Sequence, residues 1–203
     1  MDTKGFEYAL ENNRLRSWVR DLMEVRPLRK ATEVGAIPRA LHIACGGGRP
    51  TRLLLKRFAI DSLSGIDRDP SVIAEARSSF QDAAFEFSVG CVLSLDFPDD
   101  SFDAAFDLAD LHNYPDWRRG LLELRRVLKP GGLLIAEELT RESFEHAGGK
   151  IFKRLTEHPY DSMLRREEFR DFALRSGFEV LSFEELNPLG LLRYVAMVAR
   201  KAP

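Results

Sequence analysis

The sequence predicts an α/β protein: a Rossmann-like, doubly wound sheet of seven strands with helices on both faces. The sheet is expected to be mostly parallel, with a C-terminal antiparallel hairpin. Three observations predict it. An apolar run, residues 41–44, enters three glycines at 46–48, and a helix-like segment, 51–58, leaves them. Short apolar segments then alternate with amphipathic ones. Two strand-like segments, 178–183 and 191–199, close the chain.

Residues 1–37 predict a helical cap or lid, because apolar side chains recur at three- and four-residue steps over 5–26. Residues 38–138 are expected to form the ligand-binding core. Its further strands are expected at 63–67, 85–89, 101–106 and 133–136, and its helices at 70–77 and 117–128. Asp69 is placed to cap the first of these helices, and residues 129–132 end the second.

Residues 139–176 predict a helical insert that is interrupted near residue 158 and resumes over 162–168. Gly177 ends this helical region, and residues 177–203 form the final strand pair. The chain has 203 residues, 44% hydrophobic and 31% charged, as is typical of one globular domain. We therefore expect a single domain.

The sequence also indicates where in the cell the protein acts and whether it binds a metal. No apolar run approaches the roughly 18–20 residues needed to cross a bilayer, and the N-terminus has no apolar signal-peptide core. The two cysteines, Cys45 and Cys91, do not have a metal-binding spacing. We expect a cytoplasmic protein with free thiols, no membrane association and no metal site.

The net charge of −2 is unevenly distributed. Residues 1–57 carry a net charge of +6, residues 58–116 carry −11, and the remainder carries +3. The acidic middle argues against a nucleic-acid partner, although the basic N-terminal part could contact phosphate.

The expected site lies at the carboxyl ends of the strands, where doubly wound sheets bind ligands. Asp67 ends the second strand, about twenty residues after the glycines, and its two oxygens match the two hydroxyls of a ribose. Dinucleotide-binding and S-adenosylmethionine-binding sheets share this pairing. The third glycine of the dinucleotide fingerprint is absent, because Arg49, Pro50 and Thr51 follow Gly48.

Five stretches resemble motifs of class I S-adenosylmethionine-dependent methyltransferases, in particular the small-molecule group called methyltransferase type 11. These stretches are residues 41–48, 65–71, 90–98, 101–106 with 111–116, and 126–135. The resemblance covers about half of the chain, residues 38–138. It implies S-adenosyl-L-methionine as cofactor, S-adenosyl-L-homocysteine as product, and a small molecule as substrate.

The resemblance also implies which residues bind the cofactor: Ala44, Cys45, Gly46, Gly48, Asp67, Arg68, Cys91, Val92 and Asp107. Three positions depart from the family pattern. Ala44 replaces a glycine, and Cys91 replaces an aspartate that accepts the adenine amino group. His42 replaces an acid; it either takes over the hydrogen bonds of that acid or is a packed strand histidine.

Two further groups of residues are candidates for the chemistry. His112 and Asp110 could serve as general base for a substrate, or could only shape their loop. Methyl transfer to a good nucleophile depends mainly on alignment, so a base is optional. Tyr8, Trp18 and Tyr114 could line an apolar substrate pocket, or pack in the core.

The sequence therefore predicts a methyltransferase that acts on a small molecule. It contains neither the Asn/Asp-Pro-Pro-Tyr/Phe motif of adenine or glutamine N-methylation nor the Pro-Cys nucleophile of cytosine methylation. Two alternatives remain open. One is a non-catalytic, methyltransferase-like binding or regulatory module, and the other is an NAD(P)-dependent oxidoreductase on a similar sheet.

Overall fold

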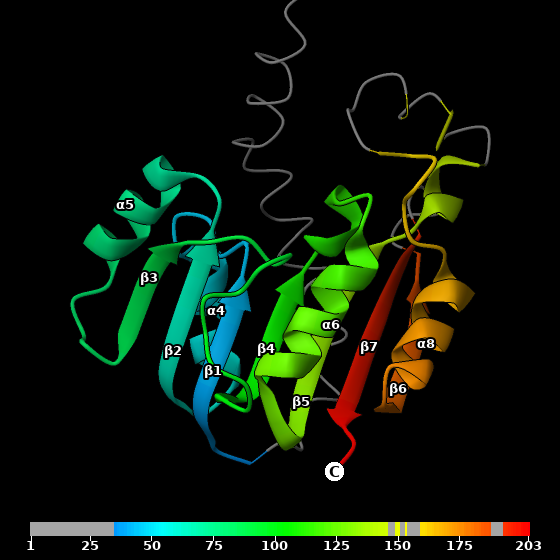
Figure 1. Cartoon of the computed structure of the whole chain (residues 1–203). Coiled ribbons are helices and arrows are strands. Elements are labelled where there is room, and N and C mark those ends of the chain that lie inside the picture. The colour runs from blue at the N-terminus through cyan, green and yellow to red at the C-terminus, as the bar shows by residue number, and fades with distance from the viewer. Residues whose placement is uncertain (1–34, 146–148, 151–152, 154–158, 188–192) are drawn as a thin grey trace, which may run out of the picture.

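The computed structural model describes residues 35–145, 149–150, 153, 159–187 and 193–203 (Figure 1). Residues 1–34 of the predicted N-terminal cap lie outside these residues, and Ile37, its last residue, begins β1. The strands are β1 (Ile37–Ile43), β2 (Ile60–Asp67), β3 (Phe85–Val89), β4 (Phe102–Leu108), β5 (Leu128–Leu139), β6 (Phe178–Leu186) and β7 (Tyr194–Lys201). The helices are α4 (Arg49–Arg57), α5 (Pro70–Ser79), α6 (Trp117–Val127) and α8 (Arg166–Arg175), with 3-10 turns η2 (Leu111–Asn113) and η3 (Arg141–Phe144).

All seven strands form one sheet in the order β3-β2-β1-β4-β5-β7-β6. Only β7 runs antiparallel to its neighbours β5 and β6. The chain builds outward from β1 to β3 and then returns to place β4 on the other side of β1. This reversal between β1 and β4 is the switch point at which such sheets bind ligands. The predicted sheet, with its antiparallel C-terminal pair, is confirmed.

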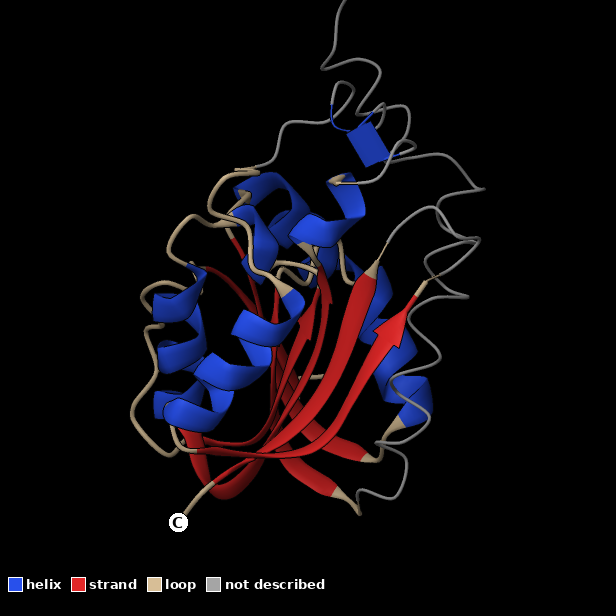
Figure 2. Ribbon diagram, turned by 90° about the vertical axis from the view of Figure 1, so that its right-hand side faces the viewer, coloured by secondary structure: helices blue, strands red, loops and turns tan. Residues whose placement is uncertain are grey.

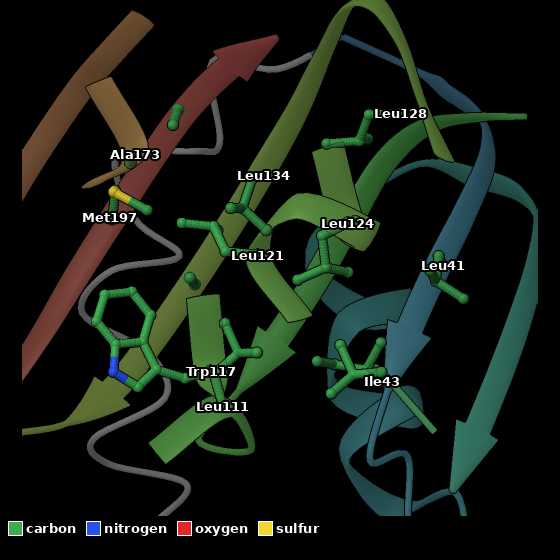
Figure 3. Packing of buried hydrophobic residues seen from close by; sticks show 14 of the residues in the cluster. Leu41, Ile43, Leu111, Trp117, Leu121, Leu124, Leu128, Leu134, Ala173 and Met197 are labelled. Atoms are coloured by element: carbon green, nitrogen blue, oxygen red, sulfur yellow. The ribbon is translucent and has the colours of Figure 1, made fainter. Parts of the chain in front are cut away.

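Helices cover both faces of the sheet (Figure 2). On one face, Trp117, Leu121 and Leu124 recur at the spacing of one helical stripe and are fully buried. Figure 3 shows Leu121 and Leu124 packed toward Leu134 of β5, whereas the Trp117 ring contacts Phe169 and Phe172 of α8. Burying side chains of this size contributes roughly 1.5–3 kcal/mol each, so α6 is firmly held beside the end of β4.

The opposite face is covered by α4 and α5. Leu54 of α4 and Ile73 of α5 are buried in a second cluster with Phe106 of β4. The N-terminus of α5 is capped as expected, because Asp69 Oδ1 accepts the Ser71 N–H at 2.8 Å. With both faces covered by helices, the carboxyl ends of the parallel strands form the rim on which loops meet.

Several element boundaries differ from those expected. Strand β2 begins at Ile60 rather than residue 63, and α8 begins at Arg166 rather than residue 162. Helix α4 begins at Arg49 rather than residue 51, because Pro50 is well suited to the first turn of a helix. Strand β5 begins at Leu128 rather than residue 133. Residues 129–132 end α6 as expected, but they do so inside an irregular strand in which Gly131 has a φ of 79°.

Candidate cofactor site

A small cavity of about 60 Å³ lies at the carboxyl ends of the strands beside the switch point. Its lining residues come from four segments that are far apart in the sequence: Ile43, Ala44, Ile66, Asp67, Arg68, Gly90, Val92, Asp110 and Tyr114. Four of the expected cofactor residues, Ala44, Asp67, Arg68 and Val92, are among them. Asp110, a candidate general base, and Tyr114, a candidate lining residue of a substrate pocket, line the same cavity.

Asp67, at the end of β2, has a half-buried carboxylate with two backbone partners. Its Oδ2 accepts the Gly46 N–H at 3.0 Å, and its Oδ1 accepts the Asp69 N–H at 3.0 Å. A carboxylate offers about four acceptor positions, so each oxygen keeps one position for another donor. This arrangement suits a vicinal diol, which presents two O–H donors side by side.

The three glycines of the turn after β1 have different surroundings. A Cβ on Gly46 would meet nothing within 4 Å, whereas one on Gly48 would lie 2.6 Å from Cε2 of Phe80. A Cβ on Gly47 would meet the Glu75 carboxylate. Gly46 is therefore the glycine beside open space, while Gly47 and Gly48 allow α5 to pack closely against the turn.

The two strands at the switch point both leave the sheet through an alanine in the left-handed region. Ala44 follows β1 with a φ of 48°, and Ala109 follows β4 with a φ of 66°. This conformation costs an L residue roughly 1–2 kcal/mol relative to ordinary backbone. Backbone strain of this kind concentrates at functional sites, and both residues adjoin the cavity region.

Arg68 and Tyr114, which both line the cavity, stack on each other. The Arg68 guanidinium lies 4.7 Å from the centre of the Tyr114 ring. Burial raises the pKa of Asp110, and the nearby Arg68 partly offsets that rise. Burial also raises the pKa of Tyr114, which interacts with Asp110 and with Cys91. Cys91 is half-buried beside this group, and its neighbour Val92 reaches the cavity wall.

Glu138, near the end of β5, is a site-forming residue that the sequence reasoning missed. Its fully buried carboxylate accepts the backbone N–H groups of Asp110, Leu111 and His112. Asp107 lies beside it, and burial followed by the Glu138 charge raises the pKa of Asp107. The available signal was a pair of glutamates, 137 and 138, directly after an apolar strand.

The two expected general-base candidates are both buried. His112 Nδ1 lies 2.7 Å from Glu138 Oε2, and burial lowers the His112 pKa to about 4, so its imidazole is neutral at pH 7. Asp110 is 7% exposed and lines the cavity, whereas His112 is not among the lining residues. Of the two, Asp110 therefore has the more direct access to a ligand.

The remaining expected residues lie in other places. Cys45 is fully buried in the cluster with α4 and α5, and burial raises its thiol pKa to about 12, so it stays a protonated, unreactive thiol. Asp107 is buried behind the cavity, and its Oδ2 has no hydrogen-bond partner within the described part of the chain. Tyr8 and Trp18 lie outside the described residues.

A second, larger groove of about 770 Å³ lies along α8, beside Pro115 and Arg118, and none of the expected site residues lines it. Its charged side chains largely pair with one another or with their neighbours, as Arg118 does with Glu168 and Arg165 with Glu145. Within the described residues there is no cluster of side chains that could hold a metal ion, and no helix is long and apolar enough to cross a membrane.

Known methyltransferases resemble this chain in sequence. Residues 41–136 match the family described as methyltransferase domain. The chain is 34% identical over 112 residues to the phthiotriol/phenolphthiotriol dimycocerosates methyltransferase of Mycobacterium leprae, which covers 55% of this chain and 42% of that protein. It is 35% identical over 114 residues to the demethylmenaquinone methyltransferase of Thermotoga maritima, covering 56% and 49%. The matches thus span less than half of either relative.

The fold has close structural counterparts. An S-adenosylmethionine-dependent methyltransferase from Mesorhizobium loti aligns with a TM-score of 0.69 at 21% identity, covering 85% of this chain and 95% of that one. This likeness concerns the fold, while the match over residues 41–136 concerns the sequence. The chain thus resembles methyltransferase domains in sequence over residues 41–136 and shares the fold of S-adenosylmethionine-dependent methyltransferases.

Proposed function

We propose that this chain transfers a methyl group from S-adenosyl-L-methionine to a small molecule and releases S-adenosyl-L-homocysteine. The observation that carries the proposal is the Asp67 carboxylate, which lines the cavity and keeps one acceptor position on each oxygen for a ribose diol. Val92, in the cavity wall, would contact the adenine ring, and Gly46 would lie beneath the methionine part.

The electrostatics support a cationic ligand. When bound, the cofactor supplies a methyl group on a positively charged sulfonium centre. Asp67 and Asp110 line the cavity, and Asp107 lies behind it with Oδ2 lacking a hydrogen-bond partner among the described residues. A buried, unsatisfied polar atom is costly unless a ligand completes it. Asp107 Oδ2 therefore suits an ammonium donor such as that of the methionine moiety.

Binding requires a local rearrangement. Pockets for small-molecule cofactors measure about 300–1,000 Å³, whereas the cavity here is about 60 Å³. Arg68 is exposed, and both Arg68 and its stacking partner Tyr114 line the cavity. The contact is worth only about 0.5–1 kcal/mol at an exposed site, so Arg68 can leave it to admit an adenosine.

The two relatives described above are named for a dimycocerosate lipid and a menaquinone precursor, so we propose an apolar small molecule as the methyl acceptor. Asp110 is the residue we propose as its proton acceptor, because it lines the cavity and burial raises its pKa above the ordinary value of an aspartate.

The test is titration calorimetry of the wild-type chain with S-adenosylhomocysteine and, separately, with NAD and NADP. We expect saturable binding of S-adenosylhomocysteine and none of either dinucleotide. Binding of a dinucleotide alone would favour the oxidoreductase. Binding of none of the three would favour a module that has kept the fold without the cofactor.

A further inference from the structure

One carboxylate anchors the loop that forms a wall of the cavity. Glu138 is fully buried, and each of its two carboxylate oxygens accepts two hydrogen bonds from a segment 26–28 residues earlier in the chain. Oε1 accepts the Asp110 and Leu111 N–H groups at 3.1 and 2.8 Å. Oε2 accepts the His112 N–H at 3.0 Å and lies 2.7 Å from His112 Nδ1.

This segment has little stability of its own. It begins at Ala109, whose φ of 66° is unfavourable for alanine, and continues as η2, a 3-10 turn of three residues. Such short turns have poorer hydrogen-bond geometry than α-helices. Without Glu138, the buried N–H groups of Leu111 and His112 would lose the acceptor shown for them. Buried unpaired donors are strongly unfavourable.

The same segment carries part of the cavity wall. Asp110 and Tyr114 line the cavity opposite Asp67 and Arg68. The place of the Tyr114 ring decides where Arg68 can stack, since the two are 4.7 Å apart. Glu138 is not among the lining residues, so any influence on the cavity passes through this loop.

The charge state of the cluster is consistent with an anchoring role. Asp107, Asp110 and Glu138 are three buried carboxyl groups, and burial raises the pKa of each. Glu138 faces four N–H donors, which favour its ionised form. Asp107 accepts only the Asp110 N–H, through Oδ1, and its Oδ2 has no partner among the described residues. With four donors on Glu138 and one on Asp107, Glu138 is the carboxylate that holds the segment, and the His112 ring donates to it from Nδ1.

We propose that Glu138 is a positioning residue of the cofactor site, which holds residues 110–114 in the place that lets Asp110 and Tyr114 wall the cavity. The inference rests on the proposed function for its ligand, but the anchoring of the loop can be measured without any ligand.

The experiment compares Glu138→Gln with the wild type and with Asp103→Asn. Glutamine keeps the shape, but it has one acceptor oxygen and turns an N–H₂ group toward N–H donors. Asp103 is a matched control at the other end of β4, where its Oδ2 accepts the Arg39 N–H at 3.0 Å. Circular dichroism first establishes that all three proteins are folded. We then measure amide exchange rates, the ¹⁵N spectrum of the His112 ring, and S-adenosylhomocysteine affinity by calorimetry.

In Glu138→Gln we expect exchange of the residue 111 and 112 amides to accelerate about tenfold or more, and S-adenosylhomocysteine affinity to fall about tenfold or more, because a charged acceptor is lost. The His112 signals should leave the Nδ1–H tautomer. Asp103→Asn should affect the Arg39 amide and the Lys129 ion pair, and should leave residues 111 and 112 unchanged. Glu138→Asp, which keeps the charge on a shorter side chain, should recover part of the affinity and serves if Glu138→Gln does not fold.

One result would overturn the proposal: Glu138→Gln is less stable, but its amide exchange rates at residues 111 and 112 and its S-adenosylhomocysteine affinity both stay within about twofold of the wild type. The loss of a charged acceptor should change both quantities by more than that. A wild type that binds no S-adenosylhomocysteine overturns the proposed function instead. The exchange rates and His112 spectrum then decide alone whether Glu138 holds the loop.

Discussion

His42 Nδ1 lies 2.8 Å from Thr51 Oγ1, which joins β1 to the first turn of α4 beneath the glycine turn. Both residues are fully buried, and His42 Nε2 has no hydrogen-bond partner among the described residues. Burial lowers the His42 pKa to about 3. The histidine that departs from the family's acid is therefore a packed, neutral residue whose bond to Thr51 supports the turn.

A first prediction concerns acid stability. In the unfolded chain His42 binds a proton below about pH 6.5, whereas in the folded chain it stays neutral down to about pH 3, so its contribution to stability is lost as pH falls between these values. His42→Asn should remove this term while keeping a polar partner for Thr51. From pH 7 to 4.5, the wild type should lose about 2–3 kcal/mol more than the variant in urea unfolding. Equal losses of unfolding free energy in the two proteins would show that His42 is protonated in the folded protein within this pH range.

A second prediction concerns the left-handed alanine after β1. Ala44→Gly should stabilise the fold by about 1 kcal/mol, because glycine adopts a φ of 48° without steric cost. Ala40→Gly is the control on the same strand, where φ is ordinary and the side chain is buried, and it should be destabilising. Thermal unfolding measures both. A destabilised Ala44→Gly would indicate that the methyl group packs favourably.

A third prediction separates the roles of the glycines. Gly48→Ala should be destabilised by about 2 kcal/mol or more, since its Cβ would overlap Phe80 at a φ of 87°. Gly46→Ala meets no atom within 4 Å and should cost only the backbone strain, about 1 kcal/mol. Phe80→Leu should reduce the cost of Gly48→Ala but leave that of Gly46→Ala unchanged. Urea unfolding of the double-mutant cycle tests this difference.

A fourth prediction concerns the adenine end of the site. The thiol of Cys91 is a weak acceptor, and Cys91 immediately precedes Val92 in the cavity wall. Cys91→Asp should bind S-adenosylhomocysteine about fivefold more tightly, the gain of one hydrogen bond of about 1 kcal/mol. Cys91→Ser is the size-matched control. Unchanged affinity in Cys91→Asp would place residue 91 away from the adenine amino group.

Much of the fold could be predicted from the sequence because its signals are local. The strand Phe85–Val89 alternates in burial preference and ends where expected, and the Asp69 cap needs only its own neighbours along the chain. The predicted start of β5 was wrong because the true start depends on pairing with β4. Residues 129–132 have the composition of a turn, and only Phe102 opposite Leu128 makes them part of a strand.

The site could be predicted where it follows from topology. The switch-point rule brought Ala44, Asp67 and Val92 together, and the structure places all three on one cavity. Side-chain direction could not be predicted: Cys45 and Ala44 are adjacent, yet Cys45 lies in the core on the α4 side. Glu138 was missed because its role depends on contacts with a segment 26–28 residues away.

The central claim is that Asp67 holds the ribose of S-adenosylmethionine, and calorimetry of Asp67→Ala with S-adenosylhomocysteine tests it most directly. Asp61→Ala, at the exposed start of the same strand, is the control. We expect Asp67→Ala to bind roughly 30- to 150-fold more weakly, the loss of about 2–3 kcal/mol from two hydrogen bonds, and Asp61→Ala to bind like the wild type. Equal affinity in all three folded proteins would contradict the claim.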